Sequence, residues 1–163
     1  MKTNWRTPPE LFNKLNAAVG GFRVDAAADA ESSFCENWYG PNSPIEDGED
    51  ALKVPLWLSP AFCNPPYDDL AGWTRKFKEQ HELGNTVVAI IPANVETDWF
   101  YTNVVQGGCS IMFMKGRVPF IDPANPTKKS QNRHPSVVLI YEHSGKAPNV
   151  NWWDWRPATK ETK

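Results

Sequence analysis

The chain has 163 residues, a formal net charge of −2 at pH 7 and a sequence pI near 5.9. This length suits one domain with a real hydrophobic core, so we expect a single domain over residues 1–163. No apolar run is long enough to span a membrane and no signal-peptide segment follows the first residues, so we expect a cytoplasmic protein without a membrane partner. Three cysteines without close spacing favour reduced core residues over a disulfide framework or a metal site: Cys35, Cys63 and Cys109.

Residues 7–21 predict the first helix. Thr7 is a good N-cap, Pro8 suits the first helical position, and Glu10 completes a capping box with Thr7. A pair of glycines at 20–21 ends the helix. The apolar residues of its buried face recur at four-residue steps: Leu11, Leu15 and Val19.

A short strand over residues 22–24 follows and ends on Asp25, after which the chain runs into small alanines. Residues 29–55 are polar and loop-rich, with a short strand around 34–39. The remaining predicted elements are, in chain order, a strand ending at 63, a helix over 69–81, a strand over 86–91, a helix over 97–105, and strands over 109–114 and 136–141. Strands alternating with helices predict an α/β fold: an open, mostly parallel sheet with flanking helices and a ligand crevice at the carboxyl ends of the strands.

The segment 115–135 carries a local basic charge within an acidic chain. It joins two predicted strands through a loop rich in proline, asparagine and lysine that no core packing explains. A loop of this length without elements of its own is usually functional or disordered. Its basic residues stand against a single acid, Asp122: Lys115, Arg117, Lys128, Lys129 and Arg133.

The sequence Asn64-Pro65-Pro66-Tyr67 follows an apolar strand directly and is the most informative motif in the chain. The prolines fix the backbone and have no N–H, so carbonyl oxygens there remain available as acceptors. Together with the side-chain oxygen of Asn64 they can receive both hydrogens of a planar NH2 group, while the ring of Tyr67 offers a stacking surface. A base inside a duplex reaches such a turn only if it is flipped out of the helix.

The ordered set of motifs resembles the phage-type DNA N6-adenine methyltransferases of the Dam family, which use S-adenosylmethionine. The resemblance covers nearly the whole chain and includes an acidic residue, Asp25, at the end of the first strand. The other matching segments are Trp5-Arg6-Thr7-Pro8, Asp50-Ala51-Leu52, Asn64-Pro65-Pro66-Tyr67, Trp99-Phe100 and Gly116-Arg117-Val118-Pro119-Phe120. The resemblance implies a Rossmann-like methyltransferase domain.

The family mechanism assigns roles to the residues of the motif. The side chain of Asn64 and the carbonyl of Pro65 would accept hydrogen bonds from the target amine, within the rigid turn that Pro66 completes. Tyr67 would stack on the extruded adenine. The methyl group of the cofactor is already activated, so positioning, electrostatics and exclusion of water do most of the catalysis, and no metal is expected.

The resemblance also implies a binding site for S-adenosylmethionine. The helix start at Thr7 and Pro8 would receive the cofactor's carboxylate. Asp25, with Ala26 beside it, would lie near the cofactor's amino group or ribose, and Asp50 would accept from its adenine amine. Asn64 would border the same site. One departure is the run Ala26-Ala27-Ala28, which replaces the glycine-rich turn of many methyltransferases.

Double-stranded DNA is the substrate that the resemblance implies, with GATC as the site of Dam-type relatives. The basic segment 115–135 is the candidate DNA-contact insert. Phosphate contacts would come from its Lys and Arg residues, and Asn132 or Arg133 could read base edges. The residue pattern leaves the oligomeric state open.

Two other hypotheses follow from the same residues. The motif would also serve a methyltransferase acting on cytosine N4, an RNA base or a protein glutamine. A non-catalytic DNA-binding protein of phage origin that retains the fold without the cofactor site would explain the alanine run, although the intact motif at 64–67 argues against it.

Overall fold

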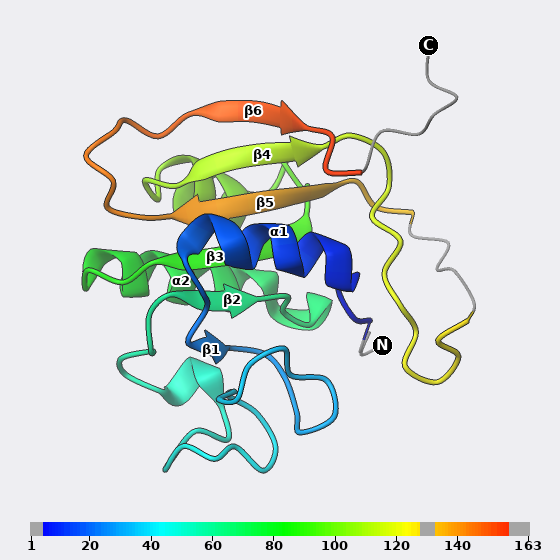
Figure 1. Cartoon of the computed structure of the whole chain (residues 1–163). Coiled ribbons are helices and arrows are strands. Elements are labelled where there is room, and N and C mark those ends of the chain that lie inside the picture. The colour runs from blue at the N-terminus through cyan, green and yellow to red at the C-terminus, as the bar shows by residue number, and fades with distance from the viewer. Residues whose placement is uncertain (1–4, 128–132, 157–163) are drawn as a thin grey trace.

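The computed structural model describes residues 5–127 and 133–156 and contains a six-stranded sheet with the strand order β1-β2-β3-β5-β4-β6 (Figure 1). Adjacent strands are parallel in the pairs β1–β2, β2–β3 and β4–β6, whereas β5 runs antiparallel to both β3 and β4. The strands are β1 (Val24–Asp25), β2 (Ala61–Cys63), β3 (Val87–Pro92), β4 (Ser110–Met114), β5 (Ser136–Tyr141) and β6 (Val150–Trp153). The predicted mostly parallel α/β sheet is therefore confirmed.

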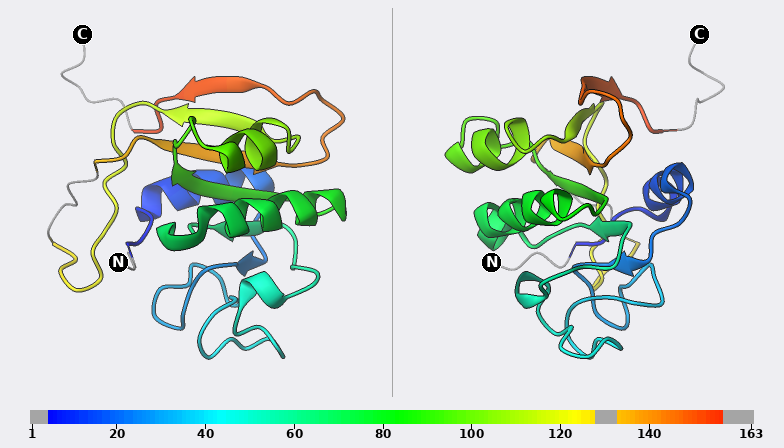
Figure 2. Two further views of the ribbon diagram at one scale, coloured as in Figure 1. Left: turned by 180° about the vertical axis from the view of Figure 1, so that it is seen from behind. Right: turned by 90° about the vertical axis from the view of Figure 1, so that its left-hand side faces the viewer.

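Helices cover both faces of the sheet (Figure 2). The helix α1 (Pro9–Val19) packs on one face, while α2 (Leu70–Glu82) and the π-helix η3 (Phe100–Val105) pack on the other. Side chains alternate between faces along a strand. In β3, Val88 and Ile90 join the apolar cluster under α1, whereas Val87, Ala89 and Ile91 join the cluster under α2. All six residues of β3 are buried, as its apolar sequence predicts.

The start of α1 differs from the prediction. Pro8, not Thr7, is the N-cap residue, and no side chain caps the helix. The Pro8 carbonyl accepts from the backbone N–H groups of Leu11 and Phe12, so Thr7 lies one residue too far from the helix to form a capping box. The predicted end is confirmed, because Gly20 adopts the left-handed conformation there.

The predicted helices at 69–81 and 97–105 begin with side-chain caps. The Oδ1 of Asp69 accepts from the backbone N–H of Gly72 at 3.0 Å, and α2 follows. The Thr97 hydroxyl accepts from the N–H of Phe100 at 3.2 Å, where the π-helix begins. These cap residues act locally, which is why the sequence alone located both helix starts.

The strands differ from the prediction in two places. Residues 34–39 form no strand; they contribute a single bridge between Trp38 and Asp25 in a loop that closes on β1. In addition, the strand β6 was not predicted from the sequence. Trp155, just after β6, is buried under α1, while Trp152 is 73% exposed on the outer strand. A strand defined mainly by pairing with distant β4 has no local signal of its own.

The carboxyl ends of β1 and β2 meet the start of the chain and the long loop after β4 on one side of the sheet (Figure 1). Residue Arg6 forms an antiparallel bridge with Ile121, which fastens the beginning of that loop beside the N-terminal segment. The segment between β1 and β2 contains a short 3-10 helix, Ala51–Lys53, and lies next to the same strand ends. Within the described residues, every helix is too short or too polar to cross a lipid bilayer.

Candidate active site

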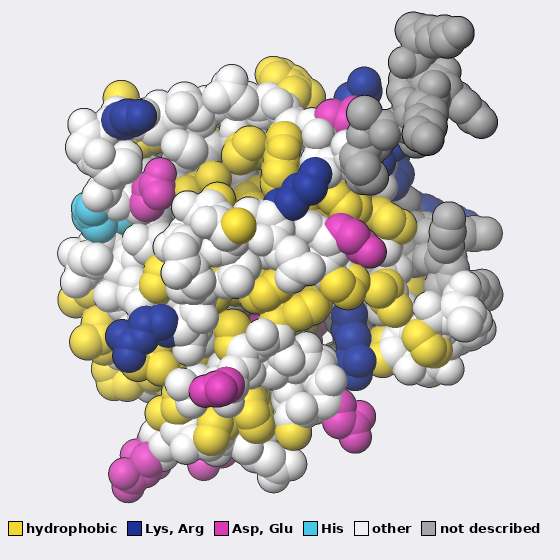
Figure 3. Space-filling model, in the orientation of Figure 1, with side chains coloured by type: hydrophobic (Ala, Val, Ile, Leu, Met, Phe, Trp, Pro, Cys, Tyr) yellow, Lys and Arg dark blue, Asp and Glu magenta, His cyan; other side chains and the backbone are white. Residues whose placement is uncertain are grey.

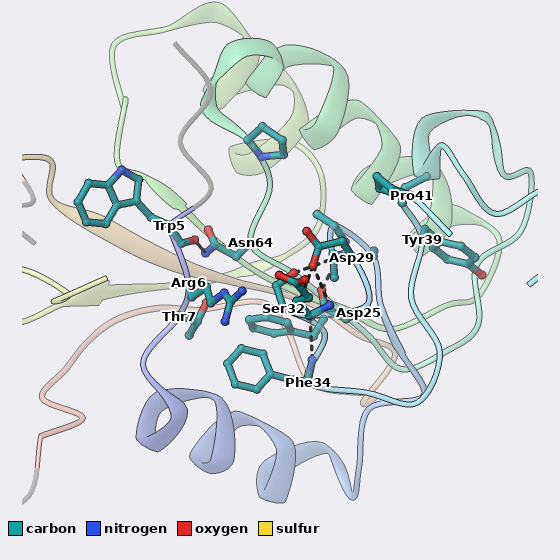
Figure 4. Close-up of a pocket in the computed structure, with 18 of the residues that line it drawn as sticks. Trp5, Arg6, Thr7, Asp25, Asp29, Ser32, Phe34, Tyr39, Pro41 and Asn64 are labelled. Carbon is teal, nitrogen blue, oxygen red and sulfur yellow. Dashed lines mark hydrogen bonds between the residues drawn. The ribbon is translucent and has the colours of Figure 1, made fainter. Parts of the chain in front are cut away.

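A cavity of about 520 Å³ opens at the carboxyl ends of β1 and β2 (Figure 4). Its wall is built by residues 5–7 before α1, by residues 25–29 at the end of β1, by residues 39–41 and 49–51 of the following segment, and by Asn64 and Pro66. This volume lies within the range of sites that hold cofactors and drug-sized ligands. The structure thus brings together five of the residues predicted for cofactor binding: Thr7, Asp25, Ala26, Asp50 and Asn64.

The side chain of Asn64 is held in one orientation. Its Nδ2 donates a hydrogen bond to the backbone carbonyl of Trp5 at 3.1 Å (Figure 4). The residue before it, Cys63, is the buried last residue of β2, so the backbone is fixed as well. With Nδ2 engaged, Oδ1 remains as the acceptor that the amide presents, and it accepts no hydrogen bond from the described residues.

Asp25 is a buried carboxylic acid at the end of β1. Only 3% of the residue is exposed, and burial raises the pKa of its carboxyl group from 3.8 to about 7. Backbone N–H groups oppose this shift: Phe34 donates to Oδ2 at 3.2 Å and Ala27 to Oδ1 at 3.4 Å. A cationic or hydroxyl donor bound in the cavity would therefore meet an acceptor that is held rigidly but incompletely ionised at neutral pH.

The alanine run after β1 fits a close turn without glycine. Ala26 is fully buried and continues the sheet, since its N–H donates to the Phe62 carbonyl at 2.8 Å. None of the three alanines has a positive φ. The glycine that permits close approach lies instead at Gly40, with φ +144°, where an added Cβ would stand 1.9 Å from the Ala28 carbonyl oxygen.

Asp50 is exposed and lines the cavity beside Ala51. Its Oδ1 accepts from the backbone N–H of Leu52 at 3.0 Å and caps the short 3-10 helix. The second carboxylate oxygen makes no hydrogen bond within the described residues. Asp50 therefore combines a structural role with a free acceptor at the wall of the cavity.

The residues of the cavity fit an S-adenosylmethionine molecule. Two buried polar atoms at the N-terminal side, Nε of Arg6 and Oγ1 of Thr7, have no hydrogen-bond partner in the described structure. Unsatisfied buried polar atoms are unusual in folded proteins, and a polar ligand would satisfy them. Carboxylates at Asp25 and Asp50 suit the donors of a ribose, an ammonium group or an adenine amine. Among the described residues, no cluster of three or more His, Cys, Asp or Glu side chains could hold a metal ion.

Three of the residues predicted for catalysis or cofactor binding do not line the cavity: Pro8, Pro65 and Tyr67. Pro65 is buried. The Tyr67 ring lies beyond Pro66 and contacts His134 edge-to-face, with 6.5 Å between the ring centroids. Burial raises the pKa of the Tyr67 hydroxyl to about 12, so the phenol stays neutral.

The predicted DNA-contact residues are only partly described. Lys115 is exposed and pairs with Asp154 at 3.6 Å. Arg117 and Arg133 are exposed. Lys128, Lys129 and Asn132 lie outside the described residues.

Several residues of the cavity wall were not assigned individually from the sequence, notably Arg6, Phe34, Gly40 and Trp73. Arg6 stands inside a segment that resembles the family, so a signal was present. Gly40 looks like an ordinary loop glycine until its contact with Ala28 is known. Phe34 follows β1 by nine residues inside a loop, and Trp73 lies on α2, so only the folded chain shows that both reach the site.

The sequence is similar to known DNA N-6-adenine-methyltransferases. A curated relative, the DNA N-6-adenine-methyltransferase of Escherichia phage T1, is 27% identical over 151 residues, which cover 83% of this chain and 61% of the relative. The chain thus spans about 61% of the length of the curated relative it matches. No solved structure gives a significant match. The family model described as DNA N-6-adenine-methyltransferase (Dam) matches residues 1–152, and the chain therefore belongs to the Dam family.

Proposed function

We propose that this protein transfers the methyl group of S-adenosylmethionine to the N6 amino group of adenine in double-stranded DNA. Membership of the Dam family and the name of the phage T1 relative support the reaction. The observation that carries the assignment to this site is the fixed amide of Asn64, which presents an acceptor oxygen at the wall of a cofactor-sized cavity. GATC remains the expected recognition sequence.

The amine is activated by hydrogen-bond acceptors. The lone pair of an aromatic amine is delocalised into the ring, and acceptors for both N–H groups favour the pyramidal form in which the lone pair can attack. Asn64 Oδ1 takes one hydrogen and the Pro65 carbonyl takes the other. The hydrogen bond from Asn64 Nδ2 to the Trp5 carbonyl holds this acceptor in place before the substrate arrives.

The target adenine leaves the DNA duplex to reach this turn. Tyr67 supplies a neutral ring on which the extruded base stacks, at the edge of the cavity marked by Pro66. The contact between Tyr67 and His134 places the end of the long loop beside the same ring. Exposed Arg117 and Arg133 on that segment contact phosphates and position the duplex.

The cofactor supplies a methyl group on a sulfonium centre that needs no further activation. Asp25 and Asp50 line different parts of the cavity wall and orient the cofactor by accepting hydrogen bonds from it. The buried carboxyl of Asp25 becomes fully ionised when a cationic donor binds beside it. The site works without a strong general base, because the proton leaves the amine only after the nitrogen has become cationic.

The test is to incubate the protein with labelled S-adenosylmethionine and unmethylated DNA, digest the DNA to nucleosides and identify the labelled product. The proposal predicts N6-methyladenine. Detection of N4-methylcytosine, labelled RNA or labelled protein would show that the enzyme methylates another acceptor than adenine in DNA. Absence of both label and cofactor binding would favour the non-catalytic DNA-binding alternative. A phage-type enzyme of this kind would act in the cytoplasm of a bacterial host.

A further inference from the structure

The side chain of Arg6 enters the cavity from a fixed backbone. Its N–H donates to the Ile121 carbonyl at 2.8 Å, and its own carbonyl accepts from the Ile121 N–H at 2.9 Å. Figure 4 shows the guanidinium pointing into the space that Asn64 and Ser32 also border. The Nε atom is buried and has no hydrogen-bond partner in the described structure. The backbone is therefore anchored, while Nε of the guanidinium has no hydrogen-bond acceptor.

Arg6 is the positive side chain of an otherwise acidic cavity wall. The carboxylates that line the wall are Asp25, Asp29, Glu31, Glu49 and Asp50. No carboxylate oxygen of the described residues lies within ion-pair distance of Arg6. The ion pairs among the described residues are Lys115–Asp154 and Arg156–Asp154. Arg6 helps to lower the pKa of the Asp29 carboxyl group, but the two side chains are not within ion-pair distance. The partly buried guanidinium, whose Nε has no hydrogen-bond acceptor, is therefore suited to bind an oxygen anion.

The neighbouring helix start is poorly equipped to bind the same anion. Pro8 and Pro9 have no N–H groups, and the N–H groups of Leu11 and Phe12 already donate to the Pro8 carbonyl. The first turn therefore offers one N–H without a backbone acceptor among the described residues, that of Glu10. Pro8 also does not line the cavity. The sequence-based expectation that the first turn of α1 receives the cofactor's carboxylate therefore has little support from the donors present.

We infer that Arg6 binds the carboxylate at the amino-acid end of S-adenosylmethionine, an inference that rests on the proposed function. The planar guanidinium matches a carboxylate with two parallel N–H donors. Thr7 adds a buried hydroxyl without a partner at the same side of the cavity. The surrounding carboxylates suit the ammonium and sulfonium charges of the same ligand, whereas they would repel a DNA phosphate, which carries no compensating cation.

This placement joins cofactor binding to the catalytic turn. The residue before Arg6 is Trp5, whose carbonyl holds the amide of Asn64 at 3.1 Å. A carboxylate bound at Arg6 would fix the segment 5–7 from the cavity side, while Ile121 fixes it from the loop side. Arg6 is thus a binding residue that also stabilises the position of the catalytic acceptor.

The inference is tested by comparing two ligands that differ at the amino-acid end. S-adenosylhomocysteine carries the carboxylate, and 5′-methylthioadenosine lacks the whole amino-acid group. Isothermal titration should show that Arg6→Gln weakens binding of S-adenosylhomocysteine roughly 10- to 100-fold, the effect of losing charge-assisted hydrogen bonds, while binding of 5′-methylthioadenosine changes less than about threefold. Arg23→Gln, an exposed arginine outside the cavity, is the matched control and should bind both ligands as the parent does.

A second measurement uses the unmodified protein and does not depend on how the variant folds. Decarboxylated S-adenosylmethionine should compete at least about tenfold more weakly than S-adenosylmethionine. The inference would be overturned if the two forms of the cofactor competed equally. It would also be overturned if Arg6→Gln weakened the binding of both titration ligands equally or of neither. Loss of DNA affinity without loss of S-adenosylhomocysteine binding would make Arg6 a phosphate contact instead. If the parent protein methylates DNA and one of these contradicting results is found, only the proposed role of Arg6 is wrong. If the parent protein binds neither S-adenosylhomocysteine nor 5′-methylthioadenosine, the proposed function is wrong too.

Discussion

At the scale of single residues, the site depends on two polar side chains that follow buried strands. Asn64 is oriented by a backbone carbonyl from a distant part of the chain, and Asp25 is held by two backbone N–H groups in a place where its charge is unfavourable. Both positions were predicted from the sequence, because a polar residue at the end of an apolar strand marks the ligand side of an α/β sheet. Their hydrogen-bond partners were not predictable, since Trp5 and Phe34 approach them only through the fold.

The raised pKa of Asp25 predicts how stability depends on pH. In the unfolded chain this carboxyl titrates near 3.8, and in the folded protein near 7. Between about pH 4 and pH 7 the native state therefore holds a proton that the unfolded chain has lost, so the free energy of unfolding falls as pH rises through this window. The full decline is about 4 kcal/mol for a shift of this size.

Substitution of Asp25 isolates this effect. Asp25→Asn cannot titrate, so urea unfolding of the ligand-free variant at several pH values should give a flatter profile across the window than the parent. Asp68→Asn removes an exposed carboxyl and should keep the parental decline. The same decline in Asp25→Asn and the parent would mean that Asp25 is not the group responsible.

At the scale of elements, a close backbone contact between Gly40 and Ala28 positions the segment between β1 and β2. Gly40 stands so close to Ala28 that a side chain would displace the strand end that carries Asp25. We predict that Gly40→Ala lowers the free energy of unfolding by at least about 3 kcal/mol, through backbone strain and steric overlap together, and weakens cofactor binding. Denaturant unfolding and ligand titration measure the two effects.

Gly84→Ala is the matched comparison, because Gly84 also has a positive φ but nothing within 4 Å of an added Cβ. It should cost only the strain of the backbone, about 1–2 kcal/mol, and leave cofactor binding unchanged. Similar losses in the two variants would show that the close approach at Gly40 does not shape the site.

The elements themselves were predictable to the extent that local pattern defines them. The helices α1 and α2 and the apolar runs of β3 and β5 each lie within one stretch of chain, and all four were confirmed. The outer strand β6 depends on pairing with distant β4, so no local pattern predicted it. The strand predicted around 34–39 is reduced to the bridge between Trp38 and Asp25. Thr7 was wrongly predicted as the N-cap, because threonine is a common capping residue but here lies one residue before the actual N-cap, Pro8.

At the scale of the whole molecule, charge is distributed unevenly. Acidic side chains gather over the segment that follows β1, drawn at the bottom of Figure 3. That segment, residues 26–55, contains seven acidic residues and one basic residue, Lys53. The long loop after β4 is basic and borders the site from another side. Repulsion at one end and attraction at the other would orient a DNA duplex toward the loop and Tyr67.

This polarity predicts the effect of reversing charge on the loop. The double variant Arg117→Glu with Arg133→Glu should bind DNA more weakly at low salt and should reduce the slope of log affinity against log salt by about 2, because two phosphate contacts are lost. Arg75→Glu, an exposed arginine on α2, makes the matched single control and should leave the slope near the parental value. Cofactor affinity should not change in either protein. An unchanged slope in the double variant would place the DNA contacts elsewhere.

The most direct measurement combines single-turnover methylation with cofactor titration for Asn64→Ala. Loss of the oriented acceptor should slow methyl transfer roughly 100- to 1,000-fold, by analogy with removing one hydrogen bond that stabilises a transition state, while the affinity for S-adenosylhomocysteine stays within about threefold of the parent. Asn13→Ala, at an exposed position of α1, should match the parent in both measurements. Methyl transfer by Asn64→Ala at the parental rate would contradict the proposed role of this turn in catalysis.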